Sequence, residues 1–301
     1  MPESSVSTSS VVVSRRPSVL ARSVGLMKPV TWFAPAWAFL CGAIASGAPL
    51  WSWQTLGLMA LGVFLAGPIV CGLSQVINDY CDKDVDAINE PQRLIPSGLV
   101  SNKQVFITIG ILSALALGLA WFLGEKVALL TAIGMVLAVI YSAHPVRAKR
   151  NGWIGNALVA ISYEGLPWLA GHAAFADITL VSLMVAIWYS VGAHGIMTIN
   201  DFKSIEGDKM AGINTIPVMY GAWGGAWIAV LTMNTAQLFV IMILAASGRW
   251  VAAAIIAGLF LLQLPFQARL IRDPKGQAVF YNATGILLFV LGMLVAAIGL
   301  R

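Results

Sequence analysis

The sequence contains very little charge. Only 10% of its 301 residues are Asp, Glu, Lys or Arg, whereas 59% are hydrophobic and the mean hydropathy is +0.84. A soluble domain carries roughly 25% charged residues. The chain therefore has too few charges to cover a water-facing surface, which excludes a soluble globular protein.

Cysteine and histidine are also scarce, with three of each. The spacing of Cys41, Cys71 and Cys81 matches no disulfide framework and no zinc site. No two histidines have the spacing of metal ligands, so we expect a structural role for each of them. Of the three, His194 lies well inside an apolar stretch. The sequence thus gives no indication of a disulfide-stabilised fold or of a His/Cys metal centre.

Long apolar stretches make up most of the chain. In lipid the backbone must satisfy its own hydrogen bonds, and the alternation typical of strands is absent, so these stretches are predicted to be helices. The predicted fold class is an all-α polytopic membrane protein. Each stretch is close to the roughly 20 residues that cross a hydrocarbon core, and we identify about nine, at 30–48, 55–77, 103–122, 126–142, 154–172, 178–199, 222–246, 250–271 and 278–300.

Lys and Arg are unevenly divided between the two sides of this predicted bundle. With the N-terminus in the cytoplasm, 15 of them lie on the inner side and 3 on the outer side. This bias follows the positive-inside rule and predicts an N-in, C-out topology. The net charge of +5 is explained by topology and gives no indication of nucleic-acid binding.

The first residues differ in composition from the rest. Residues 1–25 are rich in Ser and Val and carry three arginines, and we expect a short disordered cytoplasmic tail there. A plastid transit peptide has a similar composition but is usually longer. Residues 26–301 are expected to form a single transmembrane domain.

Two polar segments, 78–102 and 200–217, interrupt the apolar pattern on the predicted cytoplasmic side. They contain 8 of the 13 acidic residues of the chain. Internal repeats around a central site are common in membrane proteins, and we infer two related four-helix halves with a ninth helix appended. The segments match when shifted by 122 positions, which aligns Asn78 with Asn200, Asp79 with Asp201, Asp82 with Ser204, Asp84 with Glu206 and Asp86 with Asp208.

The spacing of these residues predicts a metal site. If the helices continue through the segments, each carries its polar residues within an arc of about 100° that leaves Asp84 outside. Carboxylates on one face repel one another unless a cation lies among them, and oxygen ligands without His or Cys favour Mg²⁺ over Mn²⁺ or Ca²⁺. Two such faces would form a two-cation clamp on a diphosphate. The residues on the two arcs are Asn78, Asp79, Asp82 and Asp86, and Asn200, Asp201, Ser204 and Asp208.

Basic residues on the same side complete a predicted anion site. Each of them either contacts phosphate or serves only as one of the positive charges that keep this side of the protein in the cytoplasm. Glu164 is different, because an acid inside an apolar span indicates a functional role. The basic residues are Arg93 in the first acidic segment, Lys203 and Lys209 in the second, and Arg147, Lys149 and Arg150 after the fourth span.

The motif Asn78-Asp79-x-x-Asp82-x-x-x-Asp86 resembles the first signature of the UbiA superfamily of intramembrane prenyltransferases, and the resemblance extends over residues 25–300. Within it, several strings resemble the chlorophyll and bacteriochlorophyll synthases. YEGLPW and the run GAHGIM are closer to the bacteriochlorophyll branch. The strings are NDYCDKDVDAINEPQRLIPSG (78–98), YSAHPVRAKRNGWIGN (141–156), YEGLPW (163–168) and GAHGIMTINDFKSIEGDKMAGINTIPV (192–218).

The resemblance implies a transfer of a geranylgeranyl or phytyl group from its diphosphate to the propionate of bacteriochlorophyllide. It also implies two Mg²⁺ ions and a bacterial inner membrane, with the active site facing the cytoplasm. Many members have an Asp where this chain has Ser204, so its second metal site has fewer carboxylates. The implied catalytic residues are Asp79, Asp82, Asp86, Asp201 and Asp208, and the implied metal ligands are these five together with Asn78 and Glu206. The implied diphosphate-binding residues are Asn78, Arg93, Arg147, Lys149, Asn200 and Lys203. The candidate pocket residues are Tyr141, Glu164, His194 and Ser204.

Other functions remain open from the sequence. The acceptor is alternatively chlorophyllide, a quinone precursor or haem, because the motifs do not define the acceptor pocket. A divalent-cation transporter would use the same acids, but such sites lie near the middle of the membrane on broken helices. Here both acidic clusters lie at predicted helix ends, and only Glu164 favours the transporter.

Overall fold

The computed structural model describes residues 17–301. Within them the chain forms helices and one isolated bridge between Asn151 and Asn214. The α-helices are α1 (Val19–Leu26), α2 (Phe33–Ala45), α3 (Trp53–Phe64), α4 (Gly72–Asn89), α5 (Asn102–Leu123), α6 (Glu125–Ser142), α7 (Gly152–Ala160), α8 (Leu166–Ala173), α9 (Leu180–Asn200), α10 (Ile205–Met210), α11 (Ile216–Ala246), α12 (Trp250–Arg272), α13 (Pro274–Ala283) and α14 (Gly285–Leu300).

The predicted all-α membrane class is confirmed. In the described residues, seven helical segments are long and apolar enough to cross a membrane, so the protein is an integral membrane protein. Two of the nine predicted spans are not among the seven. The span at 30–48 contains α2, which has only 13 residues, and the span at 154–172 is divided into α7 and α8.

Local sequence explains where several helices begin and end. Ser52, Ser101 and Thr179 are N-cap residues whose side-chain oxygens accept hydrogen bonds from backbone N–H groups in the first turn. Gly124 separates α5 from α6 with a φ of 135°, a conformation that favours glycine. The apolar stretches are thus divided by ordinary capping and turn residues.

Two π-helical segments, η2 (Leu65–Cys71) and η4 (Ile161–Gly165), interrupt the helical rods. The first contains Pro68, which lacks a backbone N–H and disturbs the regular hydrogen-bond ladder. The second contains Glu164. Turns of this type are frequent at functional sites, and residues of both segments line the same cavity, described below.

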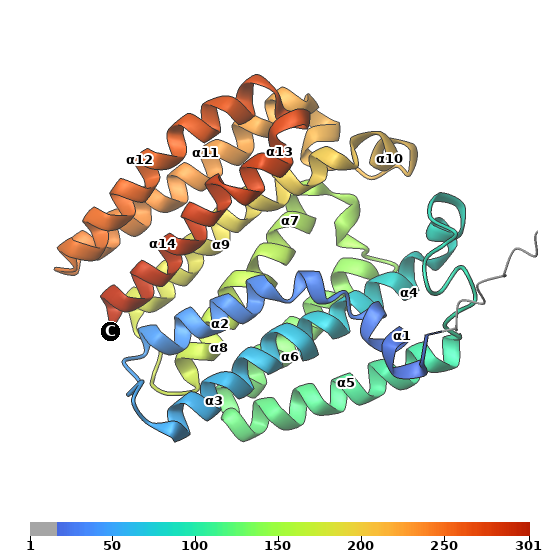
Figure 1. The fold of residues 1–301 in the computed structure, drawn as a ribbon, viewed down its shortest axis with the longest axis horizontal. Coiled ribbons are helices and arrows are strands. Elements are labelled where there is room, and N and C mark those ends of the chain that lie inside the picture. The colour runs from blue at the N-terminus through green and yellow to red at the C-terminus, as the bar shows by residue number, and fades with distance from the viewer. Residues whose placement is uncertain (1–16) are drawn as a thin grey trace, which may run out of the picture.

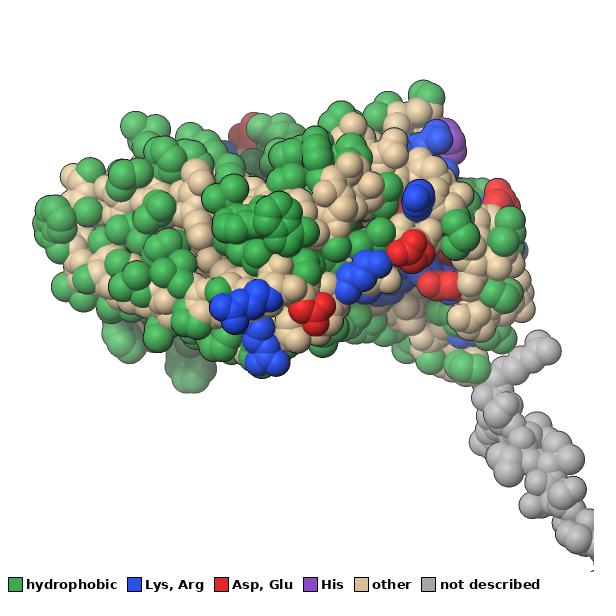
Figure 2. All heavy atoms as spheres, turned by 90° about the horizontal axis from the view of Figure 1, so that it is seen from above, with side chains coloured by type: hydrophobic (Ala, Val, Ile, Leu, Met, Phe, Trp, Pro, Cys, Tyr) green, Lys and Arg blue, Asp and Glu red, His purple; other side chains and the backbone are tan. Residues whose placement is uncertain are grey.

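The rods pack side by side in the bundle (Figure 1). Adjacent pairs include α2 with α8, α9 with α11, and α12 with α14. Hydrophobic side chains cover most of the face seen in Figure 2, and its charged side chains are confined to limited areas. This surface suits a lipid environment.

Small residues bring α2 and α8 into close contact. A Cβ added to Gly42 would lie 1.9 Å from the Trp168 carbonyl oxygen, and one added to Gly171 would lie 2.0 Å from that of Phe39. Close backbone approach at small residues is the usual basis of helix association in membranes. The pair α2–α8 is therefore fixed by these two glycines.

We predicted a disordered tail over residues 1–25, and this prediction is wrong for the last residues of that range. Residues Val19–Leu26 form α1, whose N-cap is Ser18 and whose Leu26 is fully buried. The helix packs against α4 and α5, which supplies the apolar contacts that stabilise it. Residues 1–16 lie outside the described residues.

The close packing of α2 on α8 leads to a stability prediction. Gly171→Ala should lower the midpoint of thermal unfolding in detergent, because its Cβ would overlap a backbone oxygen. Overpacking of this kind costs about 1–3 kcal/mol. Gly118→Ala on α5 is the matched control, since no atom lies within 4 Å of its added Cβ. Equal midpoints for the two variants would contradict the packing argument.

Candidate functional site

The first acidic motif lies on one continuous helix, α4. Asp79 and Asp86 are buried, each 8% exposed, whereas Asp84 is exposed on another side of the helix. The burial pattern agrees with the predicted face and with the predicted exclusion of Asp84. Helical continuity places these acids in a row at the end of a long rod.

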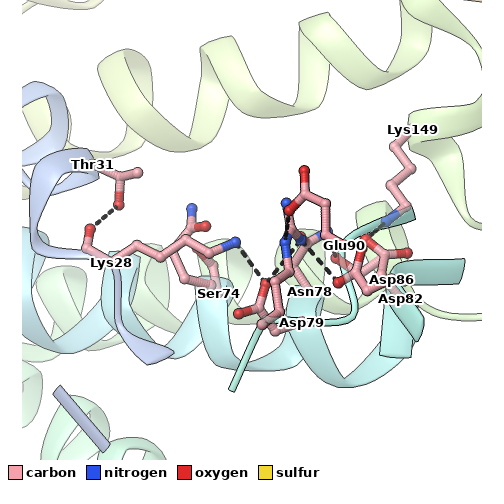
Figure 3. A network of polar contacts seen from close by, with 12 residues as sticks. Lys28, Thr31, Ser74, Asn78, Asp79, Asp82, Asp86, Glu90 and Lys149 are labelled. Atoms are coloured by element: carbon pink, nitrogen blue, oxygen red, sulfur yellow. Dashed lines mark hydrogen bonds and ion pairs between the residues drawn. The ribbon is translucent and has the colours of Figure 1, made fainter. Parts of the chain in front are cut away.

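Basic side chains neutralise this row (Figure 3). The Lys28 ammonium lies 2.6 Å from Asp79, and the Arg93 guanidinium lies 2.8 Å from Asp86. Arg93 also lies 3.8 Å from Asp79 and pairs with Glu90. One arginine thus connects three carboxylates of the same motif.

Asp82 has its own pair of cations on the segment after α6. Arg147 lies 2.9 Å from Asp82, and Lys149 pairs with the other carboxylate oxygen. Burial lowers the pKa of the Lys149 ammonium from its ordinary value, and the charge of Asp82 opposes that shift. The predicted anion-site residues Arg93, Arg147 and Lys149 therefore all lie among the acids.

The sequence argument for a metal ion considered only the acids, and the structure adds protein cations beside them. Within residues 17–301, no group of three or more His, Cys, Asp or Glu side chains is arranged to hold a metal ion. The sequence argument omitted tertiary contacts, which bring Lys28, Arg93, Arg147 and Lys149 to the carboxylates. These four protein cations neutralise negative charge of the first motif.

The second motif is built differently from the first. Helix α9 ends at Asn200, a short 3₁₀ turn, η5 (Asp201–Lys203), follows, and α10 begins at Ile205. The assumption that one helix runs through the whole motif is therefore wrong here. The Ser204 hydroxyl donates a hydrogen bond of 2.7 Å to Asp208, and burial raises the pKa of that carboxyl.

Neighbouring helices hold the beginning of the second motif. The Asn156 side-chain N–H from α7 donates to Asp201 at 3.3 Å and to the Thr198 hydroxyl at 3.3 Å. The Asn282 side-chain N–H from α13 donates to the side-chain amide oxygen of Asn200, Oδ1, at 3.1 Å. These two amides fix Asn200 and Asp201 in the absence of a continuous helix.

Glu206 was predicted to be a metal ligand, but its side chain is 75% exposed and lies 2.9 Å from Lys275 at the start of α13. This ion pair holds the pKa of the Glu206 carboxyl below its ordinary value. Because α10 starts after a turn, Glu206 projects differently from a residue on an extended α9. It does not line the cavity described next, whose wall includes Asn200, Asp201 and Ser204 of the same motif.

A cavity of about 680 Å³ lies between the two motifs. Both aligned asparagines, Asn78 and Asn200, line it, and so do Asp201, Lys203 and Ser204. Much of the remaining wall is apolar and comes from α2, η2, α6, α7 and α8, with Phe39, Leu65, Leu130, Leu137 and Leu158 among its residues. The cavity is thus polar at the motifs and apolar in the helical bundle.

Three of the four predicted pocket residues line this cavity, namely Tyr141, Glu164 and Ser204. His194 does not. Its neighbour Ala193 faces the cavity, and the rotation of about 100° per helical residue turns His194 to a separate apolar cavity of about 630 Å³. There its Nε2 lies 3.3 Å from the Trp153 carbonyl oxygen.

Several site residues were not identified from the sequence. Lys28 was counted only as a topology signal, and Asn156 and Asn282 appeared as ordinary residues of apolar spans. Gln75 and Tyr163 face each other across the cavity wall, where the Gln75 amide N–H donates to the Tyr163 hydroxyl at 2.8 Å. Polar residues one turn before a motif are the only sequence signal that could have indicated Gln75.

Comparison with known proteins identifies the family. The UbiA prenyltransferase family matches residues 35–290, which is most of the chain. The chain belongs to the UbiA prenyltransferase family. It is therefore a prenyltransferase, and a divalent-cation transporter is no longer an alternative.

Two relatives within the UbiA family cover nearly all of the chain. The bacteriochlorophyll synthase 34 kDa chain of Chloroflexus aurantiacus is 59% identical over 281 residues, which cover 93% of this chain and 90% of that protein. The chloroplastic chlorophyll synthase of Oryza sativa is 40% identical over 91% of this chain and 75% of its own length.

Solved structures show the UbiA fold. A structure described as that of a digeranylgeranylglyceryl phosphate synthase has a TM-score of 0.72 and 22% identity, over 93% of this chain and 99% of that one. A UbiA homologue from Archaeoglobus fulgidus bound to GPP and Mg²⁺ has a TM-score of 0.62 and 19% identity, over 91% and 99% of the two chains.

The positions of the acids on α4 allow a matched pair of substitutions. Asp86→Ala should reduce the rate of prenyl transfer by about 10²-fold or more, because it removes a buried carboxylate of the site. Asp84→Ala, two residues away and exposed, should have little effect. The measurement is the initial rate at saturating donor, and equally large losses in both variants would contradict the assigned face.

Proposed function

We propose that this UbiA prenyltransferase transfers a geranylgeranyl or phytyl group from its diphosphate to the propionate carboxylate of bacteriochlorophyllide. The supporting observation is the cavity, which joins the polar ends of both motifs to an apolar interior of suitable character for a prenyl chain. The acceptor is inferred from the 59% identity to a bacteriochlorophyll synthase. Chlorophyllide is the second candidate, supported by the 40% identity to a chlorophyll synthase.

We also propose that Mg²⁺ binds in this site, with two ions. The donor chemistry fits, because the motif residues that line the cavity offer amide, hydroxyl and carboxylate oxygens, which are hard ligands, beside the Lys203 ammonium. An A. fulgidus relative of the same fold is bound to GPP and Mg²⁺. When bound, Mg²⁺ would neutralise charge on the departing diphosphate. Its ligands would be Asn78, Asp79, Asp82 and Asp86 from the first motif, and Asn200, Asp201 and Asp208 from the second.

The protein cations then have a second role. Lys28, Arg93, Arg147 and Lys149 lie among the acids, and the same side chains bind oxygens of a diphosphate. As the bond between C1 of the prenyl group and the diphosphate oxygen breaks, they stabilise the charge that collects on the leaving group. Lys203 on the cavity wall is positioned for the same purpose.

The acceptor needs little activation. A propionate with an ordinary carboxylate pKa is ionised at neutral pH, so no general base is required. One carboxylate oxygen attacks C1, the new C–O bond completes the ester, and diphosphate leaves with the electron pair of the broken bond. The apolar cavity wall excludes water, which would otherwise capture the allylic cation.

We place the active site on the cytoplasmic face of a bacterial inner membrane. The 15-to-3 distribution of Lys and Arg supports this orientation. Both motifs then open to the side on which a water-soluble prenyl diphosphate head group is present.

The direct test is a reconstituted reaction. Purified protein, geranylgeranyl diphosphate and bacteriochlorophyllide should yield the esterified pigment, identified by chromatography and mass. Chlorophyllide in a parallel reaction ranks the two acceptors. A protein that releases diphosphate but forms no ester with either tetrapyrrole would contradict the proposed acceptor.

Chelation provides a prediction that separates catalysis from folding. Excess EDTA should abolish transfer, and added Mg²⁺ should restore it. The thermal unfolding midpoint should change little in EDTA, because protein cations already neutralise the buried acids of α4. Full turnover in excess EDTA would refute the metal requirement.

The contact between α13 and the second motif gives a further prediction. Asn282→Ala removes the hydrogen bond that orients Asn200, and such supporting contacts change metal affinity by about 10–100-fold. The Mg²⁺ concentration for half-maximal rate should rise accordingly. Lys275→Ala, on the same helix but paired with exposed Glu206, is the control. An unchanged Mg²⁺ requirement in Asn282→Ala would show that Asn200 is not a ligand.

A further inference from the structure

A second cavity, of about 630 Å³, lies outside the space between the two motifs, and we call it the lateral cavity. Residues of α7, η4, α8, α9 and α11 line it, and its wall has Ala160 and Leu166 in common with the cavity at the motifs. Its volume falls in the range of about 300–1,000 Å³ that is typical of small-molecule sites. No step of the proposed reaction uses this space.

The lateral cavity opens on the outer surface of the bundle. Three of its lining residues are partly exposed, namely Trp153 by 42%, Ile161 by 41% and Ile187 by 50%. They belong to α7, η4 and α9, and in an integral membrane protein such exposed apolar side chains of the bundle face lipid. A ligand can therefore enter this cavity from the bilayer without passing the two motifs.

His194 brings an unused nitrogen atom to this cavity. The residue is 9% exposed and lines the cavity wall. Its Nε2 lies 3.3 Å from the Trp153 carbonyl oxygen, and because a carbonyl oxygen only accepts, Nε2 carries the ring hydrogen. Within residues 17–301, Nδ1 is buried without a hydrogen-bond partner. In the neutral ring Nδ1 therefore has an unshared electron pair, which is costly to bury without a partner.

A histidine held in this way is suited to bind a metal. Metal-ligating histidines almost always donate their second ring N–H to a carboxylate, a backbone carbonyl or water, which fixes the ring and leaves the other nitrogen as the ligand. The Trp153 ring also packs against the imidazole of His194, with ring centroids 5.4 Å apart. Two contacts with the same tryptophan thus orient this imidazole.

The rest of the wall excludes a free metal ion. In the described part of the chain, no Asp, Glu, Lys or Arg lines the lateral cavity, so a bare divalent cation would be a buried charge without a counter-charge. Ser190 and Thr232 donate their hydroxyl hydrogens to carbonyl oxygens of their own helices, at 2.9 and 2.6 Å. The cavity therefore matches a ligand with one open metal coordination position, no net charge and an apolar body.

The product of the proposed reaction has these properties. The tetrapyrrole ring is a dianion that neutralises its central Mg²⁺, and the ion keeps an axial position open. Before the transfer the acceptor carries an ionised propionate, and the residues described here offer that charge no cation on the wall of the lateral cavity. Esterification removes the charge and adds a hydrocarbon tail. The change in charge therefore favours the product over the acceptor in this cavity.

We propose that the lateral cavity binds the esterified pigment and that Nδ1 of His194 coordinates its central Mg²⁺. The electron pair of Nδ1 forms the new bond, and no proton is released because the ring hydrogen stays on Nε2. The inference rests on the proposed function, which supplies the pigment. The protein then has a lipid-facing site that holds its product outside the cavity between the motifs.

The test measures pigment binding to the purified protein in detergent by absorption spectroscopy. Bacteriochlorophyll a is the probe, because axial ligation of its Mg²⁺ changes the absorption of the macrocycle, and its metal-free form is the matched control ligand. The wild type should bind the Mg²⁺ form more tightly by about tenfold or more, the lower end of the effects seen for contacts at metal sites. His194→Leu should lose this preference and the ligation spectrum.

A control variant separates ligation from packing in the same cavity. Thr232→Val should keep both the preference and the spectrum, since the Thr232 hydroxyl is bonded within α11. Equal binding of the Mg²⁺ and metal-free forms by the wild type, or an unchanged spectrum in a folded His194→Leu, would overturn the inference. If His194→Leu does not fold, His194→Phe replaces it, and the comparison of the two pigments on the wild type remains decisive.

The unesterified pigment tests the choice of product over acceptor. Pigment bound between the motifs is present in both proteins, so the difference in affinity between wild type and His194→Leu reports the lateral cavity alone. That difference should be large for bacteriochlorophyll a and small for bacteriochlorophyllide a, and equal differences would overturn the assignment to the product. Failure of the proposed function is distinct, because the protein would then form no ester, whichever pigment it binds.

Discussion

A carboxylate close to a membrane interior is stable only when cations or several hydrogen-bond donors surround it. The fold of this protein meets that constraint at its first motif with Lys28, Arg93, Arg147 and Lys149, which come from three different segments and meet the acids of α4. The pairing links the N-terminal segment, the loop after α4 and the loop after α6. The site and the local tertiary structure therefore depend on the same interactions.

The same arrangement is suited to a charged substrate. Cations that neutralise acids also bind diphosphate oxygens, so donor and metal would enter a site whose positive and negative groups are already balanced. The cavity continues from these polar groups into an apolar space bounded by α2, α6 and α7. Polarity therefore changes along the cavity in the same direction as along a prenyl diphosphate, from charged head group to hydrocarbon tail.

Segments that depart from regular α-helix contribute residues to the wall of the cavity. Segment η4 sets Glu164 against the cavity, η2 supplies Leu65 and Cys71 to its wall, and η5 ends α9 at the second motif. Each departure needs support from neighbouring helices, as Asn156 and Asn282 give to the second motif. The two motifs, similar in sequence, are thus supported by different means, and the inferred duplication of a four-helix unit stays a prediction.

The sequence by itself determined the all-α membrane class, the family, and the row of Asp79, Asp82 and Asp86, because hydropathy and helical spacing are local properties of the chain. It did not determine the partners of those acids, the break after Asn200, the outward position of Glu206 or the separate cavity at His194. These were decided by the tertiary structure. Which cation reaches which carboxylate, and which face of a helix meets a cavity, depends on segments far apart in the chain, and their contacts leave no periodic signal in the sequence.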